Sequence, residues 1–234
     1  MNTTDTAVAP SPASNRGFLL VVIALIVAGL GIVAFVATNG GDDEDTAGAD
    51  ETGEPAVAVE QTAPAEIDGE TLPHLPNSVA VGTADNDPAF GTAAPTMVGT
   101  DFDGTEVRIE ADGRPKAVYF VAHWCPHCQR EVPILQQLIA EGSAPDGLDL
   151  YVVSTAVDEG SPNFPPQTWL DAEGIEASIM RDDAGNSAFI AFGGAGFPYA
   201  VYLDGDNNVV SRTVGQVAPD AITQLWEATA ATGG

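Results

Sequence analysis

The stretch VAHWCPHCQREVP (residues 121–133) contains both cysteines of the chain, Cys125 and Cys128. It follows the apolar run KAVYFVA (116–122), which predicts a short buried β-strand. Apolar residues then recur at helical spacing, which predicts a helix over residues 128–141. The cysteines therefore lie between a strand and a helix N-terminus, where free N–H groups and the helix dipole favour a thiolate.

The three-residue spacing of the cysteines predicts a redox pair. It places the sulfur of Cys128 beside that of Cys125, so Cys128 can attack a mixed disulfide formed at Cys125. We therefore expect Cys125 to be the exposed nucleophile and Cys128 to be the resolving thiol. Pro126, between them, suits the first turn of the helix.

Three other interpretations of the pair stay open. A structural disulfide across two intervening residues would close almost no loop and would add little stability. A zinc site needs four ligands, and besides the cysteines the chain offers only His74, His123 and His127 as histidine ligands. In the third interpretation the domain has no redox activity and serves only as a binding module.

The N-terminal part of the chain predicts a membrane anchor. Residues 17–37 carry no charged side chain, and at about 1.5 Å per residue a helix of this length spans the hydrocarbon core of a bilayer. Arg16 precedes this segment and an acidic run follows it, so residues 1–16 are predicted to be a cytoplasmic tail. A cleaved signal peptide is the alternative, although the apolar run is longer than usual and no clean cleavage site follows.

Composition divides the rest of the chain into a linker and a domain. Residues 38–78 are rich in Ala, Pro, Gly and acidic residues, which predicts a disordered linker, and residues 79–234 are then an extracytoplasmic domain. The net charge is −27, so no nucleic acid is expected as a partner, because phosphate binding needs clustered cations. The acidity favours solubility, and it also fits a high-salt habitat or the repulsion of anionic partners.

The pattern of the domain predicts an α/β fold with a mixed sheet. Residues 97–109 predict a hairpin with its turn at Asp103 and Gly104. Farther along, we expect strands at 148–157 and 176–181, helices at 167–174, 186–193 and 219–230, and a second hairpin at 197–215.

The sequence WCPHC after an apolar strand, followed by QREVP, resembles the active site of the thioredoxin superfamily. It is most similar to the membrane-anchored TlpA/ResA-type thiol–disulfide oxidoreductases. Four further features match: an opening Ala-Pro segment with its hairpin at 93–109, Pro133 in the helix, an extra module at 158–192, and the Gly-x-Pro, strand, turn and strand at 196–215. The resemblance covers the chain from Phe90 onward. It implies a thioredoxin-like fold, with a central mixed β-sheet flanked by helices, an N-terminal β-hairpin and an inserted βα module.

The resemblance also implies roles for residues outside the cysteine pair. Pro198 aligns with the cis-proline of the superfamily. Phe197 before it would offer backbone groups to an extended substrate peptide and form an aromatic wall of the docking groove. Trp124 is expected to cover the sulfurs. The alternatives are an ordinary trans-proline at the start of a strand for Pro198 and a plain core residue for Trp124.

Glu131 matches the glutamate of the family pattern Cys-x-x-Cys-x-x-Glu-x-Pro. It shares a helix face with Leu135 and Leu138, which should point into the core. A half-buried carboxylate there could accept the proton of Cys128 during resolution. Thioredoxin itself has an aspartate six residues before its first cysteine, where this chain has Tyr119. The alternative is a first-turn glutamate that only complements the helix dipole.

His127, when protonated, would stabilise the Cys125 thiolate and hence the reduced pair, which makes the disulfide more oxidising. The same Cys-Pro-His-Cys sequence occurs in DsbA-type oxidases, but their large helical insertion has no counterpart at 158–192. Pro126 and His127 therefore favour an oxidant, whereas the scaffold favours a reductant.

The resemblance and the anchor together predict a single-pass membrane protein whose extracytoplasmic domain exchanges disulfides with exported proteins. We expect a monomeric reductant without a metal or organic cofactor, acting for example on haem-ligating cysteines in cytochrome c assembly. A membrane redox partner would recharge the pair. The alternative is a DsbA-like oxidase that introduces disulfides. Direct peroxide reduction is not expected, because VYFVAHWC (118–125) lacks the Pro-x-x-x-Thr-x-x-Cys pattern of peroxiredoxins.

Overall fold

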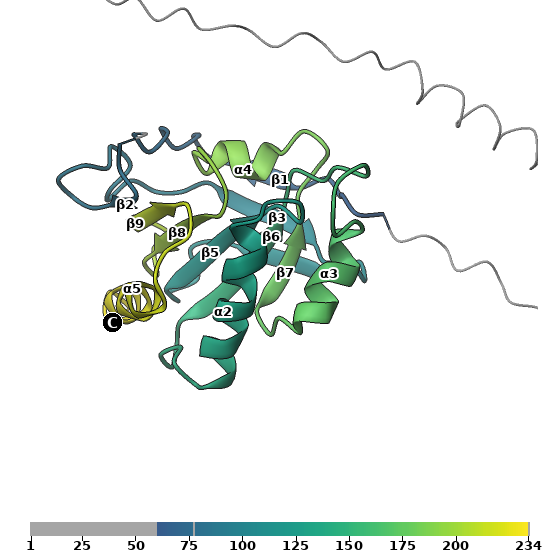
Figure 1. The fold of residues 1–234 in the computed structure, drawn as a ribbon. Coiled ribbons are helices and arrows are strands. Elements are labelled where there is room, and N and C mark those ends of the chain that lie inside the picture. Colours follow the sequence, from purple (N-terminus) through teal and green to yellow (C-terminus); the bar gives the residue numbers. More distant parts are fainter. Residues whose placement is uncertain (1–59, 77, 234) are drawn as a thin grey trace, which may run out of the picture. The chain divides into compact units, whose positions relative to one another are not determined.

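The structure, a computed structural model, describes residues 60–76 and 78–233 (Figure 1). The larger sheet has the strand order β2 (Val81–Gly82), β9 (Val209–Val214), β8 (Tyr199–Leu203), β5 (Lys116–Val121), β6 (Asp149–Ser154) and β7 (Ser178–Arg181). The smaller sheet has the order β1 (Glu66–Asp68), β3 (Thr96–Thr100) and β4 (Glu106–Ile109). The helices of the described residues are α2 (Cys128–Ala140), α3 (Pro166–Glu173), α4 (Ser187–Ala191) and α5 (Pro219–Ala230).

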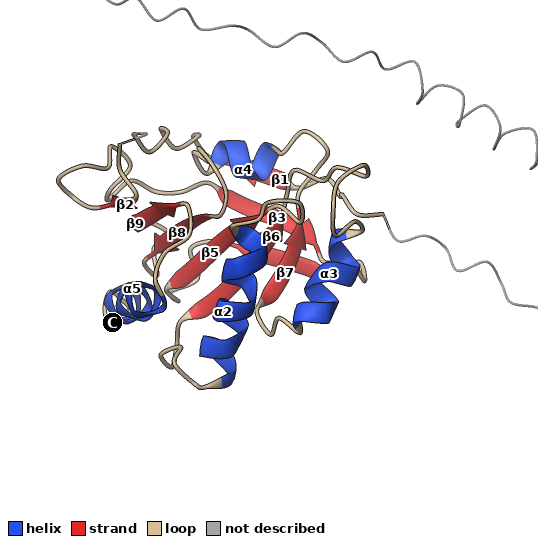
Figure 2. Ribbon diagram, in the orientation of Figure 1, coloured by secondary structure: helices blue, strands red, loops and turns tan. Residues whose placement is uncertain are grey.

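Strand β5 lies inside the larger sheet, parallel to β6 and antiparallel to β8. All its residues are buried, because its side chains alternate between two faces and both faces are covered. Tyr119 packs in a cluster with Leu135 of α2 and Trp226 of α5, whereas Phe120 packs in a cluster with Phe192, next to α4. Figure 2 shows α2 in front of the strands. The chain therefore passes from the core of the sheet directly into the helix that follows the cysteines.

The predicted α/β fold with a mixed sheet is confirmed. The helices predicted over 128–141 and 219–230 are α2 and α5. Between β6 and β8 the chain forms α3, β7 and α4, within the segment 158–192. Strands β3 and β4 pair antiparallel, and Gly104 in the turn between them has a φ of +82°, which glycine adopts without steric cost.

The predicted boundary between linker and domain at residue 79 is wrong, because residues 60–76 already belong to the domain. Strand β1 pairs with β3, and Leu72 and Leu75 are buried. The backbone N–H of Leu72 also donates to the Ala191 carbonyl oxygen at 2.9 Å. Composition missed this segment because its apolar residues are few and widely spaced, and their partners lie far away in the sequence.

The predicted membrane anchor (17–37) and the tail before it (1–16) lie outside the described residues. Within the part of the chain that the structure describes, no helix is both long enough and apolar enough to cross a bilayer. The anchor therefore stays a prediction from the sequence.

Candidate active site

The two cysteines lie where the connection from β5 meets α2. Cys125 precedes the helix and is only 6% exposed, so it is buried and not exposed as predicted, and Cys128, the first residue of α2, is fully buried. Both are free thiols. The Cys125 N–H donates to the Ala122 carbonyl oxygen and its own carbonyl accepts from the Gln129 N–H, each at 3.0 Å, so the turn that carries the first thiol is fixed on both sides. Pro126 lies in the turn before α2, not in the first turn of the helix.

The loop before β8 brings a backbone carbonyl to the first thiol. The Phe197–Pro198 peptide bond is cis, as the resemblance implies. The Cys125 thiol donates to the Phe197 carbonyl, with 3.7 Å between Sγ and the oxygen. The Pro198 carbonyl accepts from the Gly215 N–H at 2.8 Å, which ties this loop to the end of β9. Phe197 and Pro198 therefore border the thiol that would meet a substrate.

Three aromatic rings pack against one another next to the turn that carries Cys125. Trp124 donates from Nε1 to the Ala156 carbonyl oxygen at 2.7 Å and meets Phe197 edge to face, with ring centroids 5.8 Å apart. Phe189 of α4 stacks on Phe197 with centroids 4.5 Å apart. Gly194 makes room for this ring, since a Cβ there would lie 2.2 Å from it. The sequence pointed to Trp124 and Phe197 but missed Phe189, because its only signal was a weak helical pattern.

Glu131 is the buried carboxylate of the site, with only 2% of its surface exposed. Its Oε2 accepts a hydrogen bond of 3.0 Å from the Val217 N–H. Burial raises the pKa of Glu131 from its usual 4.5 to about 7, and the contact with Val217 opposes part of that rise. Burial also raises the pKa of the Cys128 thiol, and the charges of Cys125 and Glu131 add to the rise. The carboxylate is therefore more deeply buried than predicted and lies one helical turn after Cys128.

Tyr119, at the position where thioredoxin has an aspartate, contributes a neutral hydroxyl. This oxygen accepts from Trp226 Nε1 at 2.7 Å and lies 3.3 Å from the Tyr202 hydroxyl. Burial raises the pKa of both tyrosines well above their usual value of 10, and the Glu131 carboxylate adds to that rise. Both hydroxyls keep their protons, so Glu131 is the group of this cluster that can change protonation near neutral pH.

His127 is exposed in the turn before α2, and its Nδ1 lies 2.8 Å from Nη2 of Arg130. Arg130 Nε in turn donates to Gln216 Oε1 at 3.1 Å. A guanidinium only donates hydrogen bonds, so Nδ1 of the ring must accept this one. In this contact Nδ1 carries no proton, whereas the effect on the Cys125 thiolate considered from the sequence needs a protonated ring. A groove of about 360 Å³ beside this contact is lined by His127, Ile134, Gln216, Val217, Ala218 and Pro219.

His123, for which the sequence suggested no role beyond a possible zinc ligand, holds the loop after β6. Its ring is buried, with Nδ1 2.7 Å from the Pro162 carbonyl oxygen and Nε2 accepting from the Asp158 N–H at 3.1 Å. The Phe164 ring packs against it, with centroids 6.1 Å apart. Because His123 directly precedes Trp124, it connects this loop to the cysteine turn.

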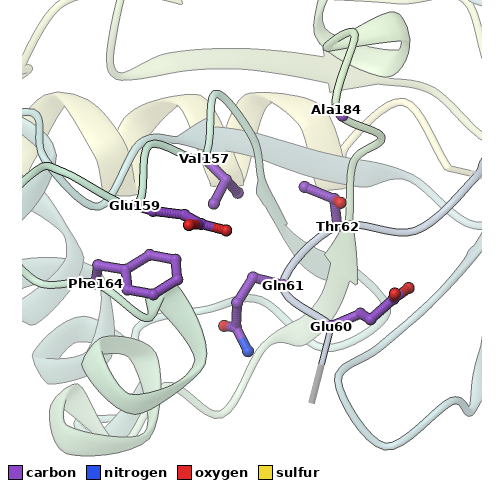
Figure 3. Close-up of a pocket in the computed structure, with 7 residues that line it drawn as sticks. All are labelled: Glu60, Gln61, Thr62, Val157, Glu159, Phe164 and Ala184. Carbon is purple, nitrogen blue, oxygen red and sulfur yellow. The ribbon is translucent and has the colours of Figure 1, made fainter. Parts of the chain in front are cut away.

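The loop after β6 also lines a cavity of about 560 Å³ (Figure 3). Figure 3 shows residues 60–62 on one side of it and Val157, Glu159 and Phe164 on the other, with Ala184 nearby. Neither cysteine lines this cavity.

The described residues offer no metal centre. Within 60–76 and 78–233, no group of three or more His, Cys, Asp or Glu side chains could hold a metal ion. His74 has its Nδ1 3.2 Å from the Gly193 carbonyl oxygen, and both ring nitrogens of His123 contact protein groups. The zinc interpretation therefore finds no support in this part of the chain.

Known proteins resemble the chain in sequence and in fold. The sequence model of the Redoxin family matches residues 89–225. The methylamine utilization protein MauD of Paracoccus denitrificans is 35% identical over 131 residues, which cover 55% of this chain and 60% of that protein. The thiol-disulfide oxidoreductase ResA of Geobacillus thermodenitrificans is 28% identical over 141 residues, which cover 59% of this chain and 77% of ResA.

Among solved structures, a DsbF homologue from Corynebacterium diphtheriae superposes with a TM-score of 0.53 at 17% identity, over 68% of this chain and 99% of that one. This likeness confirms the predicted thioredoxin-like fold. The match with MauD covers 60% of that protein, so the rest of MauD has no counterpart in the match.

Proposed function

This chain belongs to the Redoxin family, as a TlpA/ResA-type member of the thioredoxin superfamily, and on that premise we propose that it reduces disulfides of exported proteins. It is a thiol–disulfide oxidoreductase whose redox centre is the pair Cys125 and Cys128. One observation carries the proposal: Cys125 lies just before α2, against the carbonyl oxygen that precedes a cis-proline, while Cys128 and Glu131 are buried behind it.

In the proposed reaction two electrons pass from the cysteine pair to a substrate disulfide. The Cys125 thiolate attacks one substrate sulfur, the substrate S–S bond breaks, and the leaving sulfur takes up a proton. Cys128 then attacks the Cys125 sulfur, the mixed disulfide breaks, and the second substrate sulfur leaves and is protonated. The products are two substrate thiols and a disulfide between Cys125 and Cys128.

Glu131 accepts the proton of Cys128 in the second step. Cys128 is fully buried and its raised pKa keeps it protonated at neutral pH, so its attack needs a base. Glu131 lies one turn farther along α2, and a pKa of about 7 lets it take up a proton and release it again at neutral pH.

We further propose where the substrate docks and on which side of the membrane the domain lies. An extended segment of the substrate binds along Phe197 and Pro198, which border the Cys125 thiol. Residues 17–37 anchor the protein, with its N-terminus in the cytoplasm and the domain on the extracytoplasmic side. A membrane redox partner returns two electrons to the disulfide, and the domain works as a monomer without a metal or organic cofactor.

Insulin reduction tests this activity. The reduced wild-type protein should break the insulin disulfides, and Cys125→Ser should not. Cys128→Ser should still attack but stall as a mixed disulfide, which mass spectrometry detects. Equal activity of the wild type and Cys125→Ser would refute the redox function and favour a binding module.

The reduction potential of the pair decides the direction of exchange. A potential near that of thioredoxin, about −270 mV, supports the reductant. A potential near that of DsbA, about −120 mV, supports the second candidate, an oxidase that introduces disulfides. The Cys-Pro-His-Cys sequence is the observation that favours this second candidate.

A further inference from the structure

His127, Arg130 and Gln216 form an exposed polar cluster beside the cysteine pair, and the proposed reaction does not use it. We propose that Arg130 is a positioning residue that holds His127 in its neutral form. The disulfide between Cys125 and Cys128 is then less oxidising than its Pro–His dipeptide alone would make it. This inference rests on the proposed redox function and concerns the direction of exchange.

Arg130 is held from two sides. It lies three residues after His127, on the same face of the first turn of α2, and its Nη2 is 2.8 Å from His127 Nδ1. Its Nε donates to Gln216 Oε1 at 3.1 Å, and Gln216 comes from the loop between β9 and α5. The guanidinium therefore bridges the helix and this loop, with one donor directed at the imidazole.

The chemistry of the two groups fixes the protonation of the ring. Arginine carries donors and no acceptor, so the short contact requires a lone pair on His127 Nδ1. The single ring proton of a neutral imidazole is then on Nε2. To take up a second proton at Nδ1, His127 must first give up its contact with Arg130.

No acid of the described residues pairs with this cluster to favour a charged ring. Among the described residues, neither Arg130 nor His127 forms an ion pair with a carboxylate. The carboxylate of Glu131 is buried and accepts from Val217, and Asp220, in the first turn of α5, takes no part in the cluster. Arg130 therefore presents an unneutralised charge to His127, and a protonated ring would be repelled by it.

Exchange with glutathione measures how the protonation of His127 changes the equilibrium between the protein disulfide and the dithiol. The protein disulfide and two glutathione thiols give the protein dithiol and one glutathione disulfide. A protonated imidazole beside the Cys125 thiolate stabilises the dithiol form, and a neutral imidazole does not. Release of His127 from Arg130 should therefore shift this equilibrium toward the dithiol.

A double-mutant cycle of Arg130→Met and His127→Gln separates this effect from the loss of the arginine charge itself. With His127 present, Arg130→Met removes a cation and also frees the ring. In the His127→Gln background it only removes the cation. The equilibrium constant with glutathione is measured for all four proteins at pH 6 and pH 8.

At pH 6, Arg130→Met should favour the dithiol by about threefold more in the protein that retains His127 than in the His127→Gln background, the size of an interaction between exposed charges. At pH 8 this difference should be smaller, because fewer protons are available for the freed ring. Arg108→Met is the matched control, since it removes an exposed arginine from β4. It should give the same small change in both backgrounds.

The histidine tautomers provide a readout that does not depend on the potential. His123 is an internal reference, because its Nε2 accepts from the Asp158 N–H and its ring proton is therefore on Nδ1. ¹⁵N NMR of the reduced wild type should show the opposite tautomer for His127, with its proton on Nε2. In Arg130→Met this preference should weaken.

Equal effects of Arg130→Met in the two backgrounds, or a wild-type His127 with its proton on Nδ1, would overturn the inference. A wild-type protein that does not exchange with glutathione at all would refute the proposed function itself. Both side chains are exposed, so the variants should fold. Gln216→Ala, which removes only the acceptor of Arg130 Nε, should shift the equilibrium toward the dithiol, by less than the difference that Arg130→Met shows between the two backgrounds.

Discussion

Two buried carboxylates of this protein, Asp87 and Glu131, differ in what lies opposite them. Asp87 accepts from the guanidinium of Arg212, at Nε over 2.8 Å and also at Nη2, and both side chains of the pair are fully buried. Glu131, among the described residues, accepts one hydrogen bond, from the backbone N–H of Val217. One carboxylate has a full counter-charge, and the other has a single neutral donor.

This difference indicates different roles: the charge of Asp87 stabilises the fold, whereas Glu131 can take part in proton transfer. Arg212 also donates to the Pro73 carbonyl oxygen at 2.8 Å and to the Tyr199 hydroxyl at 3.0 Å, so its guanidinium holds both Pro73 and Asp87 against β9. Among the described residues no cation pairs with Glu131, and burial raises its pKa to about 7. A buried acid that changes protonation near neutral pH is suited to proton transfer.

Removal of the Arg212 cation that pairs with Asp87 should have the largest effect on the free energy of unfolding. Arg212→Met leaves the Asp87 carboxylate buried without a counter-charge, which should lower the free energy of unfolding by about 4 kcal/mol. Urea denaturation followed by circular dichroism at pH 7 measures this loss.

A double variant controls for the size of the removed side chain. Asp87→Leu combined with Arg212→Met leaves no buried charge and should be clearly more stable than Arg212→Met alone, although Asp87 also accepts from the Ala89 N–H. A double variant as unstable as the single one would show that the charge pairing is not what stabilises this region.

Glu131 should give the second-largest effect on stability, and this effect depends on pH. The folded-state pKa is about 7 and the usual value is 4.5, so the folded protein binds an extra proton between these values. The contribution is fully present below about pH 4.5 and is lost as the pH rises to about 7, by roughly 3 kcal/mol in total. Glu131→Gln should lack this loss, which urea denaturation of both proteins from pH 4.5 to pH 8 measures. Parallel stability curves would contradict the raised pKa.

The features that the sequence predicted are those that local patterns control. The central strands and α2 follow from apolar periodicity, and the place of Glu131 behind the cysteine pair follows from its spacing on the helix. The partners of the two buried acids were not predictable, because Asp87 and Arg212 are 125 positions apart and Glu131 and Val217 are 86 apart. Local sequence patterns do not predict contacts between such distant positions. The docking of residues 60–76 was not predicted for the same reason.

His127 shows how a distant contact can bear on a hypothesis drawn from a local sequence. The dipeptide between the cysteines suggested that a protonated ring would make the disulfide more oxidising, whereas the ring contacts Arg130, one turn along, which in turn contacts Gln216. Arg130 was visible in the sequence, but the acceptor that orients its guanidinium comes from 86 positions away.

Glu131 should also control the second step of exchange, by roughly a hundredfold in rate. The reduced protein mixed with glutathione disulfide first forms a mixed disulfide at Cys125, which Cys128 then resolves. Glu131→Gln removes the base for Cys128, so the mixed disulfide should persist, and acid quenching with mass spectrometry measures its lifetime. The difference from the wild type should be large above pH 7 and vanish well below it, because the wild-type carboxyl group, with a pKa of about 7, is then protonated.

Glu141→Gln provides the matched control, because it makes the same substitution at an exposed position at the other end of α2. It should leave the lifetime of the mixed disulfide unchanged. If Glu131→Gln resolves the mixed disulfide as fast as Glu141→Gln does at pH 8, Glu131 serves only as an acceptor that holds the Val217 backbone. Glu131 would then be a structural acid like Asp87, and the proton of Cys128 would have to leave by another route.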